Sequence, residues 1–228
     1  SNNKLVIEFL NFFCDYINLN NIKKINAKNS IDIEINNLKG SIGVVDYLNS
    51  QLDSINFEGK FNNSILTIDK FSAQGFKGKI EGGFNYNTKN SKTKANLVLK
   101  ELNIRYLSRE IKELSIAQSG RLSALIDAEF IGYNLDDIKK TIKAYVKFNI
   151  NDGELTQFAK LERFLQAGNI LSQSILKLSL NSSLSAISKQ NTGYFKTIEG
   201  TVKIQNSIAN IQYIKSIGPN MSLYLTGK

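Results

Sequence analysis

Residues 200–227 read GTVKIQNSIANIQYIKSIGPNMSLYLTG, and this stretch decides the fold. Apolar Val202 and Ile204 alternate with polar neighbours, and a period of two places successive side chains on opposite faces of a β-strand. The polar residues 205–207 and the Gly-Pro-Asn sequence at 218–220 interrupt the alternation, as hairpin turns do. The stretch therefore predicts three antiparallel strands with one apolar face and one polar face.

The same plan recurs earlier in the chain. Residues 57–86 repeat the order strand, turn, strand, turn, strand, and residues 120–132 and 142–150 alternate in the same way. Repeated units of this kind indicate a stacked or elongated architecture rather than a closed globule. We therefore predict a mainly β fold with a helical insertion, in which repeated antiparallel hairpin units form an elongated, curved, groove-like sheet.

Several segments read differently from this plan. Residues 4–16 are compatible with a strand or a helix, and residues 72–75 read as a turn. Residues 151–153, Asn-Asp-Gly, interrupt the strand period, and a helical pattern follows at about 154–180. Residues 44–54 predict a short amphipathic helix. The residues that give this last segment its helical spacing are Val45, Leu48, Leu52 and Ile55.

Composition excludes several kinds of chemistry. The chain has 228 residues, is 42% hydrophobic and contains no His and one Cys. Without His it lacks the commonest general base and metal ligand, and a single Cys14 forms no internal disulfide. We expect Cys14, among aromatic residues, to be an inert buried thiol. Carboxylates such as Asp127 and Glu129 read as members of a solvated face, because catalytic carboxylates occur as pairs held in a cleft. We therefore expect no enzyme activity, catalytic residue, metal or cofactor.

The net charge of +9 raises the question of a nucleic-acid surface. Nucleic-acid-binding proteins cluster their basic residues, whereas the lysines here are scattered along the chain. We therefore attribute the charge to composition and expect no nucleic-acid partner. No stretch reaches the ~20 apolar residues of a membrane helix. The chain begins with Ser1, so we interpret it as a fragment and leave a targeting or membrane segment upstream open.

The order of motifs in the second half of the chain resembles a known family. A strand ends at Asn151-Asp152-Gly153, the amphipathic segment KLERFLQAGNIL follows at 160–171, and GYFKTIEG at 193–200 leads into the closing strands. This order is similar to the C-terminal region of AsmA-like proteins, the group that includes the YhdP and TamB relatives. The resemblance covers roughly residues 116–228, so we divide the chain into a β-repeat segment at 1–115 and an AsmA-like C-terminal module at 116–228, with the helical insertion inside the module.

The resemblance implies a periplasmic β-groove protein that is tethered to the inner membrane by a segment outside this chain. It implies a non-enzymatic role in outer-membrane homeostasis, in which phospholipid is carried between the inner and outer membranes. Its expected partners are phospholipid, the membrane and other envelope proteins.

The alternating rows suggest where acyl chains would lie. Apolar burial stabilises by ~0.8 kcal/mol per methylene and has no preferred direction, so an apolar groove shields a lipid without fixing its position. An ordinary closed core remains open as the alternative for each of these side chains. The predicted lipid-binding residues are Leu122, Ile126, Phe130, Ile142, Val146, Phe148, Val202, Ile204, Leu223 and Leu225.

Three other functions remain open at this point. The chain could be a structural scaffold of the envelope that pairs with partners through its sheet edges, a nucleic-acid-binding protein, or an enzyme acting on lipid or glycan. The scaffold is the principal alternative, because it also needs no catalytic group.

Overall fold

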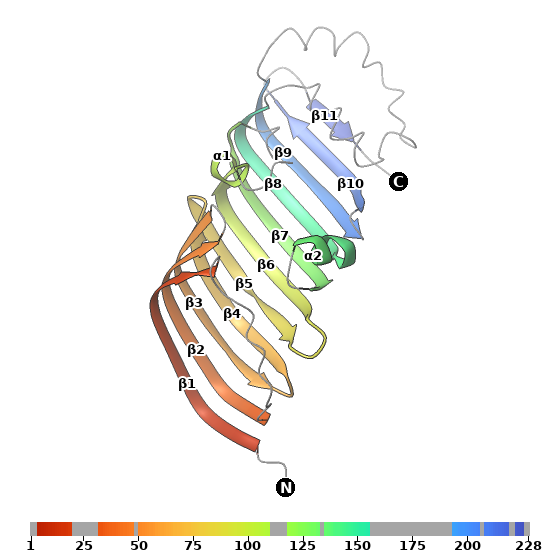
Figure 1. The fold of residues 1–228 in the computed structure, drawn as a ribbon. Coiled ribbons are helices and arrows are strands. Elements are labelled where there is room, and N and C mark those ends of the chain that lie inside the picture. Colours follow the sequence, from red (N-terminus) through yellow and green to blue (C-terminus); the bar gives the residue numbers. More distant parts are fainter. Residues whose placement is uncertain are drawn as a thin grey trace.

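The computed structural model describes residues 4–19, 32–47, 50–109, 118–132, 135–155, 193–205, 208–218 and 222–225. Within them, eleven strands form one open sheet in which spatial order follows chain order from β1 to β11 (Figure 1). The strands are β1 (Lys4–Asn18), β2 (Asp32–Tyr47), β3 (Ser50–Asn62), β4 (Ile65–Gly75), β5 (Gly78–Asn87), β6 (Lys92–Asn103), β7 (Arg121–Ile131), β8 (Lys143–Leu155), β9 (Gly193–Gln205), β10 (Ile208–Ile217) and β11 (Ser222–Leu225). The helices are α1 (Ile104–Leu107) and α2 (Leu135–Thr141).

The predicted fold class is confirmed, with one difference in strand orientation. The sheet is long and curved (Figure 1), and every neighbouring pair from β2 to β11 is antiparallel. The ambiguous N-terminal segment is a strand, β1, and it pairs with β2 in parallel. A parallel pair needs a crossover connection instead of a hairpin turn, so this first pair departs from the repeated hairpin plan.

The helix expected at 44–54 is wrong, because β2 extends to Tyr47 and β3 begins at Ser50. The pairing of β3 with β4 is irregular between Asp53 and Asn56, and Ser54 has a positive φ of 51°. Such a β-bulge inserts one extra residue into the strand. Ile55 and Leu52, three residues apart, therefore both contribute to one apolar cluster, and this spacing imitates the period of a helix.

Two predicted interruptions are also wrong. β4 continues through residues 72–75, and the turn lies at Phe76 and Lys77, whose φ angles are 52° and 61°. β8 continues through residues 151–153 to Leu155, with Asp152 at a φ of 51° inside the strand. In the first place the turn therefore comes directly after the expected residues, and in the second Asp152 has a positive φ without ending the strand.

The helical insertion expected at about 154–180 falls almost entirely outside the described residues. Its first two positions, 154 and 155, belong to β8, and described residues resume at 193. The division expected at residue 115 also lies in a segment that is not described. On either side of it, β6 pairs with β7 in the same sheet.

Two buried clusters lie near the same ends of the strands. In the first, α1 places Ile104 and Leu107 against Leu122 of β7 and Phe195 of β9. The second lies across β2, β3 and β4 and is formed by Val45, Ile55 and Ala73. Apolar contacts between strands therefore pack the side of the sheet where β2, β4 and β6 end and β3, β7 and β9 begin.

Aromatic rings cover glycines on neighbouring strands. Phe57 pairs directly with Gly40, and a Cβ at Gly40 would lie 1.9 Å from the Cζ atom of the Phe57 ring. Phe148 pairs with Gly200 in the same way, with 2.8 Å between its Cζ atom and such a Cβ. Only glycine leaves space for these rings to lie against the neighbouring strand.

Candidate functional site

The site is built from the register of the strands. Residues paired directly across neighbouring strands share one face of a sheet, so the pairing identifies rows of side chains. One row crosses ten strands without a polar residue, and we call it the central row. Its members are Phe12, Gly40, Phe57, Phe71, Gly82, Leu97, Ile126, Val146, Val202 and Ile211.

A second row runs beside the central row on the same face, and it also contains no polar residue across ten strands. Its members are Leu10, Leu38, Gly59, Ile68, Phe84, Ala95, Ala128, Ala144, Ile204 and Ala209. We call the two rows together the apolar face. With neighbouring strands roughly 4.8 Å apart, nine spacings extend about 43 Å. The apolar face is therefore a continuous strip that runs across the strands and along the length of the molecule.

The described residues leave most of this strip without a second layer. Apart from the sheet they form only α1 and α2, and α1 covers the buried cluster near the strand ends. Leu97, Ile126 and Val146 of the central row are half-buried. Ile68 and Ile211 of the two rows are buried, each 4% exposed. A sheet with one apolar face ordinarily buries that face against another layer, so a partly exposed strip of this length is a candidate binding surface.

Four of the residues predicted to bind lipid lie side by side on this strip. Val146 pairs directly with Ile126 on one side and with Val202 on the other, and Ile204 lies in the second row. The structure thus brings Ile126, Val146, Val202 and Ile204 together across three neighbouring strands.

The other predicted residues have different surroundings. Leu122 is only 8% exposed within the α1 cluster, so it is a core residue there. Phe148, like Ile126, is partly buried and packs against that cluster. Phe130 pairs with Thr93 at the far end of β7. Ile142 precedes β8 and donates its backbone N–H to the carbonyl oxygen of Ile138.

For two residues of β11 the structure describes the backbone alone. Leu223 pairs with Ser216 and Leu225 pairs with Ile214. These pairings place both residues in the sheet beside β10.

Sequence reasoning missed the N-terminal half of the strip. Leu38, Phe57 and Phe71 continue the central and second rows into β2, β3 and β4, although the proposed lipid-binding residues began at Leu122. The available signal was the alternation of Phe and Gly in residues 57–86. It identified strands, but it did not show which strands are neighbours.

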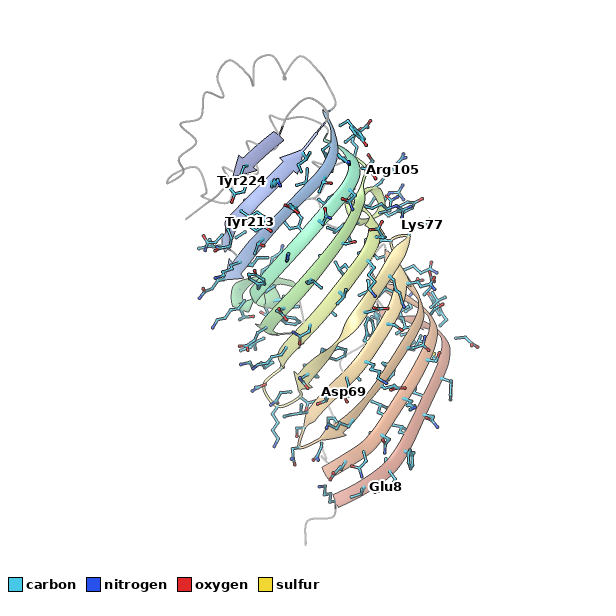
Figure 2. All side chains as sticks on the ribbon, turned by 180° about the vertical axis from the view of Figure 1, so that it is seen from behind. Glu8, Asp69, Lys77, Arg105, Tyr213 and Tyr224 are labelled. Carbon is cyan, nitrogen blue, oxygen red and sulfur yellow. The ribbon has the colours of Figure 1, made fainter. Side chains whose placement is uncertain are left out.

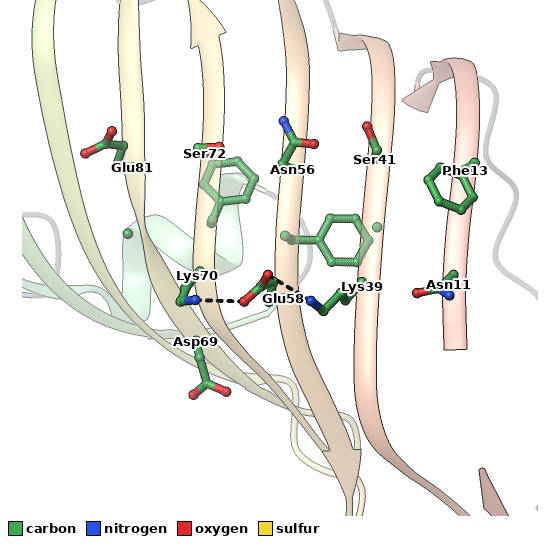
Figure 3. Close-up of a pocket in the computed structure, with 14 residues that line it drawn as sticks. Asn11, Phe13, Lys39, Ser41, Asn56, Glu58, Asp69, Lys70, Ser72 and Glu81 are labelled. Atoms are coloured by element: carbon green, nitrogen blue, oxygen red, sulfur yellow. Dashed lines mark hydrogen bonds and ion pairs between the residues drawn. The ribbon is translucent and has the colours of Figure 1, made fainter. Parts of the chain in front are cut away.

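The opposite face, which we call the polar face, carries glutamates that are each flanked by two lysines. Glu58 lies between Lys70, at 2.9 Å, and Lys39, at 3.3 Å (Figure 3). Hydrogen bonds from Lys70 and then Lys39 hold the pKa of Glu58 below its usual value. Hydrogen bonds from Lys100 and then Lys79 lower the pKa of Glu81 to about 2.

Glu129 repeats the arrangement between Lys92 and Lys94. The hydrogen bond from Lys92 lowers the pKa of Glu129. A carboxyl group that acts as a general acid near neutral pH has a raised pKa. The three glutamates are shifted in the opposite direction, and they serve as charged partners of a solvated face.

Three depressions open on the polar face or at its edge. One of about 660 Å³ lies over the Glu58 ion pairs, with Phe13 at one side (Figure 3). Another of about 660 Å³ includes Asp127 and Tyr145, and the third, of about 950 Å³, lies beside Tyr106. Charged side chains line each of them, such as Lys70, Glu129 and Lys100, whereas the two rows of the apolar face contain none.

Basic side chains gather around Tyr106 at the end of the third depression. The Lys77 ammonium lies 5.8 Å from the centre of the Tyr106 ring and the Arg109 guanidinium lies 5.2 Å from it, within the range of a cation–π interaction. Arg121 donates from Nη1 to the backbone carbonyl oxygens of Lys77 and Glu101, at 3.2 and 3.3 Å. Figure 2 shows Lys77 and Arg105 at this end of the sheet.

The described part of the chain contains no cluster of three or more His, Cys, Asp or Glu side chains that could hold a metal ion. None of its helices is long and apolar enough to cross a membrane. Comparison of the chain with protein-family models, with curated proteins and with solved structures returned no significant match.

Proposed function

We propose that this chain shields phospholipid acyl chains along its apolar face and conducts them between the inner and outer membranes of the cell envelope. The observation that supports the proposal most is the central row, in which apolar residues and glycines follow one another directly across ten strands. The resemblance to AsmA-like proteins supplies the setting: a periplasmic protein, tethered to the inner membrane, that supports outer-membrane homeostasis.

The dimensions and the energetics of the strip suit this role. One leaflet contributes about half of the ~30 Å hydrocarbon thickness of a bilayer, so a strip of about 43 Å is longer than a single acyl chain. Burial stabilises by ~0.8 kcal/mol per methylene. A chain of roughly sixteen carbons that loses half of its exposure against an open face would gain about 6 kcal/mol. This affinity holds a chain but lets it move along the strip.

Hydrophobic contact is non-directional, which suits movement along the strip. Neighbouring positions of the central row, such as Leu97, Ile126 and Val146, offer similar apolar side chains at each strand. An acyl chain that shifts from one strand to the next exchanges equivalent contacts and breaks no specific hydrogen bond. The apolar face therefore supports binding and passage with the same residues.

Site-specific photo-cross-linking tests the location. A photoreactive residue at Leu97 of β6 lies on the apolar face, whereas the adjacent Val98 lies on the polar face, and both positions are half-buried. We expect Leu97 to cross-link phospholipid in cells or vesicles at several times the yield of Val98. Equal yields at the two positions would contradict binding at the apolar face.

A charge substitution tests whether the strip is required. Val146→Glu places a carboxylate in the central row, and Lys147→Glu changes the next residue of β8, which is exposed and pairs with Leu125 on the polar face. We expect Val146→Glu to lower the co-purified phospholipid, measured by thin-layer chromatography and native mass spectrometry, at least tenfold. Lys147→Glu should retain it. A lipid-free wild-type protein that also refuses added phospholipid would refute the proposal.

The alternative function, a scaffold that pairs with partners through its sheet edges, is favoured by a specific observation. β1 is an edge strand of fifteen residues, and its Phe9 and Phe13 are 75% and 79% exposed. A scaffold would retain its partner when its lipid is removed, whereas the lipid-carrier proposal requires the apolar face.

A further inference from the structure

The edge strand β1 is unlike the rest of the polar face. The polar sides of β2, β3 and β4 carry the ion pairs of Lys39, Glu58 and Lys70, whereas β1 presents Phe9 and Phe13 on that side. On the apolar side β1 presents Leu10 and Phe12, which are 38% and 41% exposed. Over residues 9–13 the strand therefore carries exposed apolar side chains on both faces, whereas the polar faces of the next three strands carry ion pairs.

Within the described residues, β1 is an edge strand of the sheet. Its inner edge pairs with β2 over the whole strand, and among the described residues no strand pairs with its outer edge. The opposite edge of the sheet, β11, is four residues long. Natural proteins protect exposed edges by shortening them or by adding charges and proline. From Leu5 to Cys14 the only charged residue is Glu8, and no proline is present, so this part of the β1 edge has little of this protection.

We propose that the outer edge of β1 pairs with β1 of a second copy of this chain, antiparallel, about a two-fold axis at Asn11. The proposal rests on the edge itself and does not depend on the lipid-carrier function. The residues around Asn11 read Phe9-Leu10-Asn11-Phe12-Phe13, which is nearly the same sequence in both directions. Antiparallel pairing of two copies is self-complementary for such a sequence.

The register follows from the axis. Asn11 lies opposite Asn11 of the second copy, and Phe9 lies opposite Phe13. Leu10 then faces Phe12 on the apolar side. Aromatic and apolar cross-strand pairs are favourable, and two side-chain amides opposite each other can exchange hydrogen bonds. In this register the aromatic rings of Phe9, Phe12 and Phe13 each lie opposite an apolar side chain of the second copy.

The charges of β1 permit this register. In it Glu8 lies opposite Cys14, Asp15 lies opposite Ile7, and Lys4 lies opposite Asn18 of the second copy. Like charges directly opposite each other would be unfavourable, and no such pair occurs. Because the axis is perpendicular to the sheet, the apolar faces of the two copies lie on the same side and form one strip.

The complementarity also explains why a second copy fits better than an unrelated strand. An unrelated partner would need its own run of aromatic and amide residues in matching order, whereas a second copy supplies them by symmetry. Because β1 has fifteen residues, residues 9–13 and the residues on both sides of them can pair with the second copy. The described part of β11 has four residues, too few to pair over the same length.

Disulfide formation tests the register. Cys14 is the only cysteine, so in a Cys14→Ser background Asn11→Cys places a single thiol at the axis. We expect Asn11→Cys to form a disulfide-linked dimer under mild oxidation, read on a non-reducing gel. Asp15→Cys in the same background is the control, because its two copies would lie about eight residues apart, or roughly 27 Å, beyond the reach of a disulfide.

A second cross-link uses the native thiol. Glu8→Cys lies opposite Cys14 of the second copy, so oxidation of this variant should also link two chains. The wild-type chain, with Cys14 alone, should remain unlinked. The proposed pairing would be overturned if Asp15→Cys linked at the same yield as Asn11→Cys. It would also be overturned if both Asn11→Cys and Glu8→Cys failed to link.

The oligomeric state provides an independent readout. We expect light scattering of the wild-type chain to give twice its mass of 25.5 kDa. Phe13→Lys should raise the dissociation constant of the dimer at least tenfold. Leu125→Lys, at a 53% exposed apolar residue in the central strand β7, should leave it unchanged. A monomer at all concentrations, including one that instead captures a different protein through β1, would overturn the proposal.

Discussion

The contact between Phe57 and Gly40 gives a prediction whose magnitude follows from the structure. A Cβ at residue 40 would lie 1.9, 2.3 and 2.5 Å from three atoms of the Phe57 ring. Such approaches force the ring to move, and overpacking of this kind costs about 1–3 kcal/mol. Alanine is otherwise better than glycine inside a strand by roughly 0.5–1 kcal/mol. We therefore expect Gly40→Ala to destabilise the protein by about 2 kcal/mol.

The destabilisation by Gly40→Ala should depend on the Phe57 ring, which supplies the three atoms nearest to the new Cβ. In a Phe57→Ala background the atoms nearest to the new Cβ are absent, and only the advantage of alanine over glycine remains. The same Gly40→Ala change should then stabilise the protein by about 0.5 kcal/mol. The coupling energy between the two sites, measured as a double-mutant cycle, should be about 2.5 kcal/mol.

Urea unfolding followed by far-UV circular dichroism measures the cycle, since the chain contains no Trp. With an m-value of about 3 kcal/mol/M, a loss of 2 kcal/mol lowers the midpoint by about 0.7 M. Additive effects of Gly40→Ala and Phe57→Ala would refute the reasoning, because they would show that the ring does not occupy the space above Gly40. The central row would then lack its packing between β2 and β3.

Three further predictions concern stability. The pKa of Glu81 is lowered from 4.5 to about 2, so between these pH values the native state binds fewer protons than the unfolded state. The stability that the Glu81 carboxylate contributes is therefore full above about pH 4.5 and should be lost as the pH falls towards 2. A pH series of urea midpoints should show a smaller decline in Glu81→Gln and at high salt. Ile104 is 0% exposed, and Ile104→Ala should cost about 3 kcal/mol in urea unfolding, whereas Ile131→Ala, at a 46% exposed residue, should cost less than about 0.5 kcal/mol. Arg121→Ala removes two hydrogen bonds, one of them to the Lys77 carbonyl, and should speed hydrogen exchange in that turn about fivefold, for a loss of about 1 kcal/mol.

The sequence predicted the strands whose alternation is undisturbed. In β8 and β9, the alternating residues Val146 and Val202 lie on one face, as expected, because a period of two carries that information within each strand. The pattern failed where the backbone departs from regular pairing. The bulge at Ser54 adds a residue, so the apolar spacing changed from two to three and resembled a helix.

Strand neighbours and surface roles were harder to predict. Residues 4–16 do not alternate clearly between apolar and polar side chains, and the period of a strand does not show whether its neighbour runs parallel to it, as β2 does to β1. The candidate site was incomplete for the same reason: Phe57 and Phe71 join the central row only once the register is known. Leu122 was predicted to line the groove, with a closed core as the alternative, and the structure places it in the buried cluster with Ile104 and Leu107 of α1. A contact between distant segments cannot be inferred from the period of one strand.

The single layer with its strands in chain order has a consequence for how such a molecule changes in length. Each strand contacts mainly its two neighbours, so inserting or deleting a hairpin would leave distant strands undisturbed. One hairpin adds two strands, or about 10 Å, and extends the hydrophobic path by that distance. The length of the apolar face is thus set by the number of hairpins, and duplication of a short coding segment would be enough to extend it.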